Sequence, residues 1–166
     1  MRIMSSWGWR ALVLATVVLT IGCDRVTKRV AAESLAGAQP RSYLANTVRL
    51  EYAENTGGFL SLGENLPAGA RTNLFTIGTG VLLLVVAGAA FALRADPRAF
   101  TGFSLVLAGG ASNLADRLVH GRVVDFLNVG VGPLRTGIFN VADAAITIGV
   151  LLLLIPWRRS SIFASL

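Results

Sequence analysis

The segment 109–143 contains three aspartates among only nine Asp and Glu residues in the 166-residue chain: Asp116, Asp125 and Asp143. Its two ends merge into long apolar stretches, and ionisable groups near membrane depth are functional candidates because they are expensive to bury. Two carboxyl groups that lie close together cannot both ionise, so one keeps a proton while the other acts as a general base. The segment therefore predicts an aspartate dyad that activates water for attack on an amide carbonyl at a bilayer boundary.

The three aspartates differ in their neighbours along the chain. Asp116 is followed by Arg117, a cation that can hold it ionised. Asp125 lies in the apolar, β-branched run RVVDFL, where desolvation raises the pKa of a carboxyl group. Asp143 is followed by no cation before Trp157. The residues alone leave the choice of partners open, but they favour Asp125 with Asp143.

Two further polar groupings lie on the expected helices. Asp24 and Lys28 are four residues apart and share one helix face, as an interfacial ion pair or as an orienting pair for a site. Asp24 favours the charged form of Lys28, which argues against a lysine base. Asn113, Asp116 and Arg117 also share a face, either as a polar helix end or as part of a site.

The chain has few of the residues that disulfides, zinc sites and histidine-dependent catalysis require. One cysteine, Cys23, rules out an internal disulfide framework. One histidine, His120, argues against a histidine-rich zinc site, and a Ser-His-Asp triad would depend on this residue, which we expect in a loop. The net charge of +6 comes without a basic run interleaved with aromatics, so we expect no nucleic-acid partner. We expect no metal and no organic cofactor.

The composition predicts one integral-membrane domain over residues 1–166. The chain is 54% hydrophobic and 14% charged, with a mean hydropathy of +0.64. A spanning helix needs about 20 mainly apolar residues. We therefore predict an all-α membrane fold with four transmembrane helices, at about 9–28, 73–94, 99–117 and 138–157.

The distribution of arginines predicts the topology. With four spans both termini lie on one side, where the short segments are dense in arginine; the positive-inside rule makes that side cytoplasmic. These arginines are Arg2, Arg10, Arg94, Arg98, Arg158 and Arg159.

The region 40–70 lies on the other side, and its stretch TVRLEYA alternates apolar and polar residues before a turn at Asn55 to Gly58. This pattern is typical of an interfacial hairpin or small sheet, with a surface loop as the equal alternative. Residues 122–138, rich in Gly and Val, are expected to form an interfacial loop.

The N-terminus permits a second interpretation. Residues 1–23 combine arginines, an apolar run and the sequence TIGC, like a cleaved lipoprotein signal peptide. However, Leu19 stands four residues before Cys23 rather than three, and the remainder is itself a multi-span membrane protein. We therefore expect a retained first helix, with Cys23 as a small packing residue.

Five motifs in this order resemble the lipoprotein signal peptidase family (signal peptidase II) of bacterial inner membranes: DRVTK at Asp24, ENTGGFLSL at Glu54, GGASNLADR at Gly109, VVDF at Val123 and FNVAD at Phe139. The resemblance implies an aspartic endopeptidase that cuts prolipoproteins just before the lipid-modified cysteine, with Asp125 and Asp143 as the catalytic dyad. It also implies supporting roles for Asp24, Lys28, Asn55, Gly57, Asn113, Asp116, Arg117 and Asn140.

The same resemblance implies the surroundings of the enzyme. It implies a periplasmic β-cradle over about 47–62, an active site toward the periplasm, lipid-modified prolipoprotein substrates, contact with membrane lipids and inhibition by globomycin-type cyclic peptides. We expect a monomer. A proton- or ion-coupled small transporter would also place aspartates in its spans, but the four short spans show no internal repeat.

Overall fold

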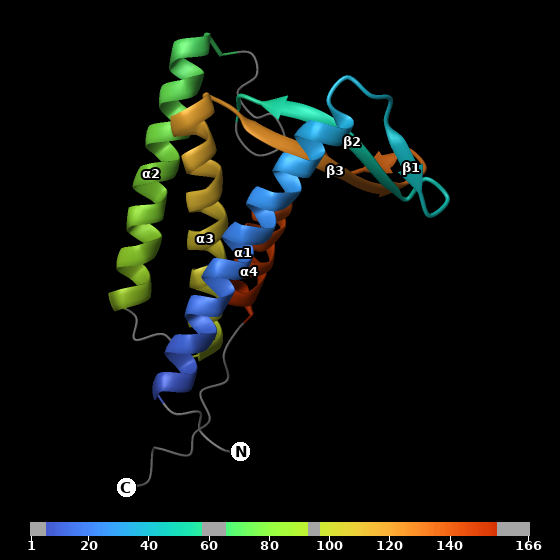
Figure 1. The fold of residues 1–166 in the computed structure, drawn as a ribbon. Helices are drawn as coiled ribbons and strands as arrows, with labels where there is room; N and C mark the ends of the chain where they lie inside the picture. Colours follow the sequence, from blue (N-terminus) through green and yellow to red (C-terminus); the bar gives the residue numbers. More distant parts are fainter. Residues whose placement is uncertain (1–5, 58–65, 93–96, 156–166) are drawn as a thin grey trace, which may run out of the picture.

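A bundle of helices carries a small antiparallel sheet at one end, while α1 begins and α4 ends at the other (Figure 1). This computed structural model describes residues 6–57, 66–92 and 97–155. In chain order the elements are α1 Ser6–Leu35, β1 Arg41–Tyr43, β2 Val48–Asn55, α2 Ala68–Ala92, α3 Pro97–His120, β3 Val123–Val131, β4 Leu134–Arg135 and α4 Val141–Leu154.

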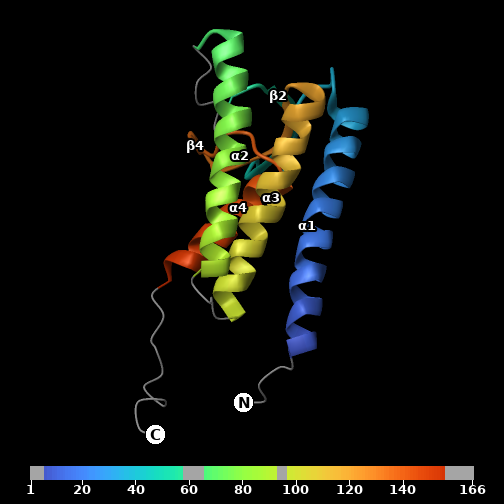
Figure 2. The ribbon, with the colours of Figure 1, turned by 90° about the vertical axis from the view of Figure 1, so that its left-hand side faces the viewer.

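Helix α3 organises the bundle. It lies between α1 and α2 (Figure 2) and packs most extensively on α4. Small residues make the α3–α4 contact close: a Cβ at Gly109 would lie 2.5 Å from the carbonyl oxygen of Ala142, and one at Gly149 would lie 2.7 Å from that of Gly102. Glycine at these positions lets the two backbones approach each other, as in membrane helix packing.

The sheet has the order β1-β2-β3-β4, with all neighbours antiparallel. The small sheet predicted around 40–70 is present, but the long partner of β2 is β3, which pairs Val129 with Val48 and Val123 with Asn55. The expectation of a loop over 122–138 is therefore wrong. The run VVDFLNV is rich in β-branched and apolar residues, and it completes the sheet from a distant part of the chain.

Of the helix boundaries that differ from the expected spans, two have a clear physical cause. Helix α1 continues beyond residue 28 because Leu35 in its last turn packs against Phe126 of the sheet. Helix α4 begins at Val141 rather than at residue 138, since Phe139 pairs with Leu127 as an isolated bridge. The hydrogen bonds to β3 hold this entry segment extended until the helix starts.

One helix in the described ranges, α2, is long and apolar enough to cross a membrane by itself, over Gly69–Ala92 with a hydropathy of 2.3. Only 6% of its apolar window is buried inside the protein, so its surface faces outward. Helix α4 is apolar but shorter. Four spans therefore remain a prediction. The arginines at residues 2, 94, 158 and 159 lie outside the described residues. Cys23 is exposed, so the expectation of a packing role is wrong.

Candidate active site

Asp125 is presented by the alternation of β3. Successive strand residues point to opposite faces, so Phe126 packs toward Leu35 of α1 while Asp125 points the other way. The Asp125 carboxylate accepts two amide hydrogen bonds: Oδ1 from Asn140 Nδ2 at 2.7 Å and Oδ2 from Asn55 Nδ2 at 2.9 Å. A strand residue is thus tied to the neighbouring strand and to the start of α4.

The Asp125 side chain is buried, and its surroundings change its pKa. The residue is 2% exposed. This burial raises the pKa of Asp125 above its usual value, although the hydrogen bonds from Asn55 and Asn140 and the charges of Lys28 and Arg117 act in the opposite direction. Desolvation disfavours the charged form, whereas hydrogen bonds to the carboxylate favour it. The pKa of Asp125 is raised overall, so its protonated form persists to higher pH than that of an ordinary aspartate.

Asp143 enters the same site from the first turn of α4. Asn140 is the N-cap of this helix and forms a capping box with Asp143: Asn140 Oδ1 accepts from Asp143 N at 2.9 Å, and Asp143 Oδ2 accepts from Asn140 N at 3.3 Å. Asp143 Oδ1 also accepts from Asn113 Nδ2 at 2.8 Å. Because Asn140 also donates to Asp125, one asparagine bridges the two aspartates.

Lys28 lies at the centre of a buried ionic cluster behind these aspartates. Its Nζ lies 2.7 Å from each of three acceptors: Asp24 Oδ2, Asn113 Oδ1 and Asp116 Oδ2. An ammonium group has three N–H donors, so this coordination is complete and belongs to the charged form. The alternative of an exposed interfacial pair is wrong, since Asp24 is 0% and Lys28 6% exposed.

Asp24 connects α1 to the start of α4. Its Oδ1 accepts from the backbone N–H of Ala142 at 2.9 Å, and its Oδ2 accepts from Ser112 Oγ at 2.7 Å. The first N–H groups of a helix have no partner within the helix, and a carboxylate there satisfies one of them. Sequence reasoning missed Ser112; its only signal is a small hydroxyl beside Asn113.

The partners of Asp116 also differ from the expected ones. Its Oδ1 accepts from Arg25 Nη1 at 2.6 Å, and its Oδ2 accepts from Lys28. The expectation that Arg117 is the cation holding Asp116 is therefore wrong, because helical neighbours at i and i+1 point in different directions. Arg25 was missed, although it lies within the motif DRVTK beside Asp24.

Arg117 instead holds the turn that follows β2. Its Nη2 donates to the carbonyl oxygen of Gly57 at 2.8 Å, while Gly57 N donates to Asn55 Oδ1 at 2.9 Å. The Nε of Arg117 is buried and has no hydrogen-bond partner among the described residues. All ten site residues expected from the sequence therefore lie in one connected hydrogen-bond network.

An apolar groove leads to this network. It encloses about 440 Å³ between α2, α3 and α4, and Asn113, Arg117 and Asp143 form its polar part. Its remaining lining is mostly apolar and includes Phe75, Leu82, Leu83, Val106, Ile146 and Val150. Within the described ranges, no three His, Cys, Asp or Glu side chains are grouped as a metal ion would require. The groove can hold an apolar chain beside a carboxyl group.

The chain is similar to known proteins in both sequence and fold. A lipoprotein signal peptidase of Streptococcus pneumoniae is 32% identical over 157 residues, which cover 92% of this chain and 96% of the relative. One of Chlorobaculum tepidum is 36% identical, covering 80% and 85%. A solved structure of a bacterial membrane enzyme has a TM-score of 0.75 at 25% identity, covering 87% of this chain and 91% of the other. The family described as Signal peptidase (SPase) II matches residues 16–158, and the chain belongs to this family.

Proposed function

We propose that this protein is an integral membrane aspartic endopeptidase that removes the signal peptide from diacylglyceryl-modified prolipoproteins, cutting just before the lipidated cysteine. The observation that carries the proposal is the pair Asp125 and Asp143, bridged by Asn140 beside an apolar groove. Relatives named lipoprotein signal peptidase, similar over most of their length, support the substrate class.

The proposed reaction uses one protonated and one ionised carboxyl group. The ionised aspartate takes a proton from water, and the resulting hydroxide attacks the carbonyl carbon of the scissile amide. The protonated aspartate donates a hydrogen bond to the carbonyl oxygen as negative charge develops there. Collapse of the tetrahedral intermediate breaks the C–N bond, and the leaving nitrogen takes a proton from the dyad. Asp125 and Asp143 fill these two roles.

The groove explains how a lipid-modified substrate could be held. Burying an acyl chain against apolar side chains such as Leu83 and Val150 supplies binding energy without a charged anchor. The buried Nε–H of Arg117 supports a donor role toward the substrate backbone. We place the sheet end of the bundle toward the periplasm of the inner membrane, with both termini cytoplasmic and four spans. Globomycin-type peptides would then compete for the groove of a monomer.

The proposal is tested by replacing Asp125 or Asp143 with Asn and measuring cleavage of a lipidated prolipoprotein peptide. General acid–base catalysis contributes about 100- to 10,000-fold to the rate. Each variant should therefore lose at least about 100-fold in activity. Glu51→Gln removes a carboxylate from β2 outside the network and is the matched control.

Full activity in either dyad variant would contradict the assignment. Loss of turnover in a folded Asp116→Asn variant, with the dyad variants active, would identify a different partner. Proton flux across liposomes without peptide cleavage would favour a transporter.

A further inference from the structure

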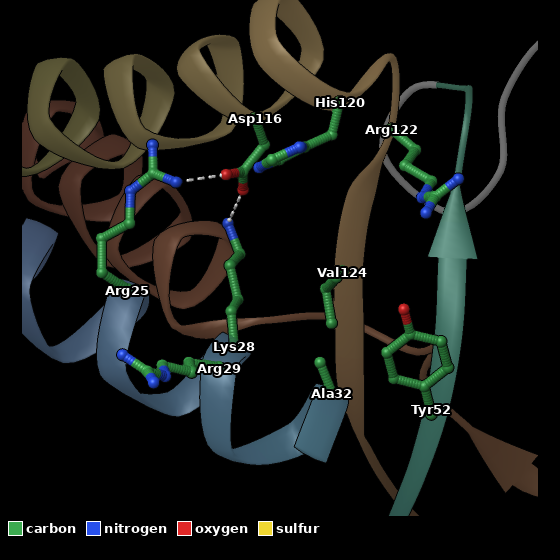
Figure 3. Close-up of a pocket in the computed structure, with 9 residues that line it drawn as sticks. All are labelled: Arg25, Lys28, Arg29, Ala32, Tyr52, Asp116, His120, Arg122 and Val124. Carbon is green, nitrogen blue, oxygen red and sulfur yellow. Dashed lines mark hydrogen bonds and ion pairs between the residues drawn. The ribbon is translucent and has the colours of Figure 1, made fainter. Parts of the chain in front are cut away.

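A second cavity lies away from the groove, on the side where α1 and α3 meet the sheet (Figure 3). It encloses about 470 Å³ and shares no lining residue with the groove. Ala32 of α1 and Val124 of β3 form part of its wall, and Tyr52 of β2 lies along its edge. It is therefore distinct from the groove, although Lys28 and Asp116 of the buried ionic cluster are among its lining residues.

Basic side chains dominate this cavity. Arg25 and Arg29 reach it from α1, His120 from the last turn of α3 and Arg122 from just before β3. Its only carboxylate, in the part of the chain that the structure describes, is Asp116. That carboxylate already accepts from Arg25 and from the buried Lys28 (Figure 3). The lining is thus suited to an anion.

The arginines keep donors for an incoming ligand. Arg25, Arg29 and Arg122 each contact one carboxylate through a single nitrogen among the described residues, although a guanidinium carries five N–H donors. Their side chains are 43%, 79% and 49% exposed, respectively. Exposed ion pairs contribute little to stability, so a phosphate can recruit these groups at small cost. The planar fork of arginine matches phosphate oxygens in pairs.

The surroundings of the cavity indicate where the anion comes from. Val26 and Val30 follow Arg25 and Arg29 by one residue each, a rotation of about 100° around the helix, and they are 63% and 53% exposed. Val119 of α3, next to His120, is 72% exposed. Exposed apolar side chains flanking a basic cavity fit acyl chains beside a charged headgroup. We propose that this cavity binds the phosphate-bearing headgroup of an anionic membrane lipid.

The test uses the full chain in phosphatidylcholine nanodiscs doped with phosphatidylglycerol, with retained lipid counted by native mass spectrometry. Arg29→Gln/Arg122→Gln removes two cations from the cavity and should weaken retention roughly 30-fold. Arg41→Gln/Arg49→Gln removes the same charge from β1 and β2 outside the cavity and should leave retention unchanged. Because both cavity arginines are exposed, thermal denaturation in pure phosphatidylcholine should show that the variant remains folded.

A gain of binding gives an independent check. Glu33→Gln removes the carboxylate that pairs with Arg29 at 2.8 Å, so it should strengthen phosphatidylglycerol retention. Equal losses in the two arginine double variants would overturn the proposal, because they would indicate attraction by overall charge alone. Displacement of the lipid by millimolar inorganic phosphate would overturn the lipid as occupant. The measurement requires no turnover, so its result is independent of the proposed peptidase activity.

Discussion

Three asparagines orient the proposed dyad by a common arrangement. Each accepts an N–H donor at its Oδ1 and directs its Nδ2 at a carboxylate of that dyad. Asn113 accepts from Lys28, and its amide nitrogen therefore turns to Asp143. In the same way, Asn55 accepts from a backbone N–H and donates to Asp125. Lysine and backbone N–H groups can only donate, so the amide orientations follow from hydrogen-bond chemistry. Amides support the dyad without locking both carboxylates in the ionised form.

Replacing Asn55 by Ala should change the pH dependence of cleavage. The hydrogen bond from Asn55 favours the ionised form of Asp125 and lowers its pKa against the effect of burial. Its loss raises that pKa further, so the limb of the pH profile that reports Asp125 should move to higher pH. The shift should be about one pH unit, given about 1.5–3 kcal/mol for a hydrogen bond to a charged group.

The measurement is kcat/KM against pH for Asn55→Ala, with Glu51→Gln as the control on the same strand. A limb that stays in place or moves to lower pH would show that Asn55 does not tune Asp125 as described. Circular dichroism would verify that the sheet survives the loss of the contact to Gly57.

The position of α4 relative to α3 decides where Asp143 lies. Glycine at Gly109 brings the backbone of α3 against the first turn of α4 at Ala142. The same turn is held from α1 by Asp24, which caps the N–H of Ala142. The first turn of α4 is therefore fixed by two other helices. These contacts also fix the position of the Asp143 carboxylate, which lies in that turn.

Gly109→Ala should impair both catalysis and stability. The new Cβ would lie 2.5 Å from a backbone oxygen, so α4 must shift, and overpacking of this kind costs about 1–3 kcal/mol. A displacement of about 1 Å in a reacting group can cost roughly 100-fold in rate. Gly88→Ala in α2 meets nothing within 4 Å and is the matched control. Activity and thermal stability would be compared; wild-type activity in Gly109→Ala would contradict the argument.

The whole molecule joins two parts that could not form the site separately. The sheet presents Asp125, the bundle presents Asp143, and the groove beside Asp143 is formed by helices alone. Asn55, at the end of β2, and Arg117, near the end of α3, are joined through Gly57. The arrangement places the proposed reaction site beside the apolar groove.

Val150→Trp should lower acceptance of lipidated substrates. Val150 lines the groove, and an indole ring there would occupy space that we assign to acyl chains. Each excluded CH₂ removes about 0.8 kcal/mol of burial, so loss of two should raise KM about tenfold. The control is Val81→Trp, because Val81 of α2 is 55% exposed and lies outside the groove. Equal kinetics for the two variants would show that acyl chains bind elsewhere.

The candidate carboxylates could be recognised from the local sequence, because carboxylates in apolar stretches are costly to bury. Spacing along one helix also showed that Asp24 and Lys28 share a face. The alternation of the stretch around Val48–Asn55 predicted a strand, since side-chain period depends only on local geometry.

Tertiary structure decided which groups meet. The strand over Val123–Val131 could not be predicted because its partner lies about 70 residues earlier in the chain. Periodicity indicates which face of a strand is buried, but it does not identify the partner strand. For the same reason neither Arg25 as the partner of Asp116 nor Asp24 as a cap for α4 could be predicted. The types of the residues indicated which of them could react. The distances that bring them together in one site depend on contacts between elements far apart in the chain.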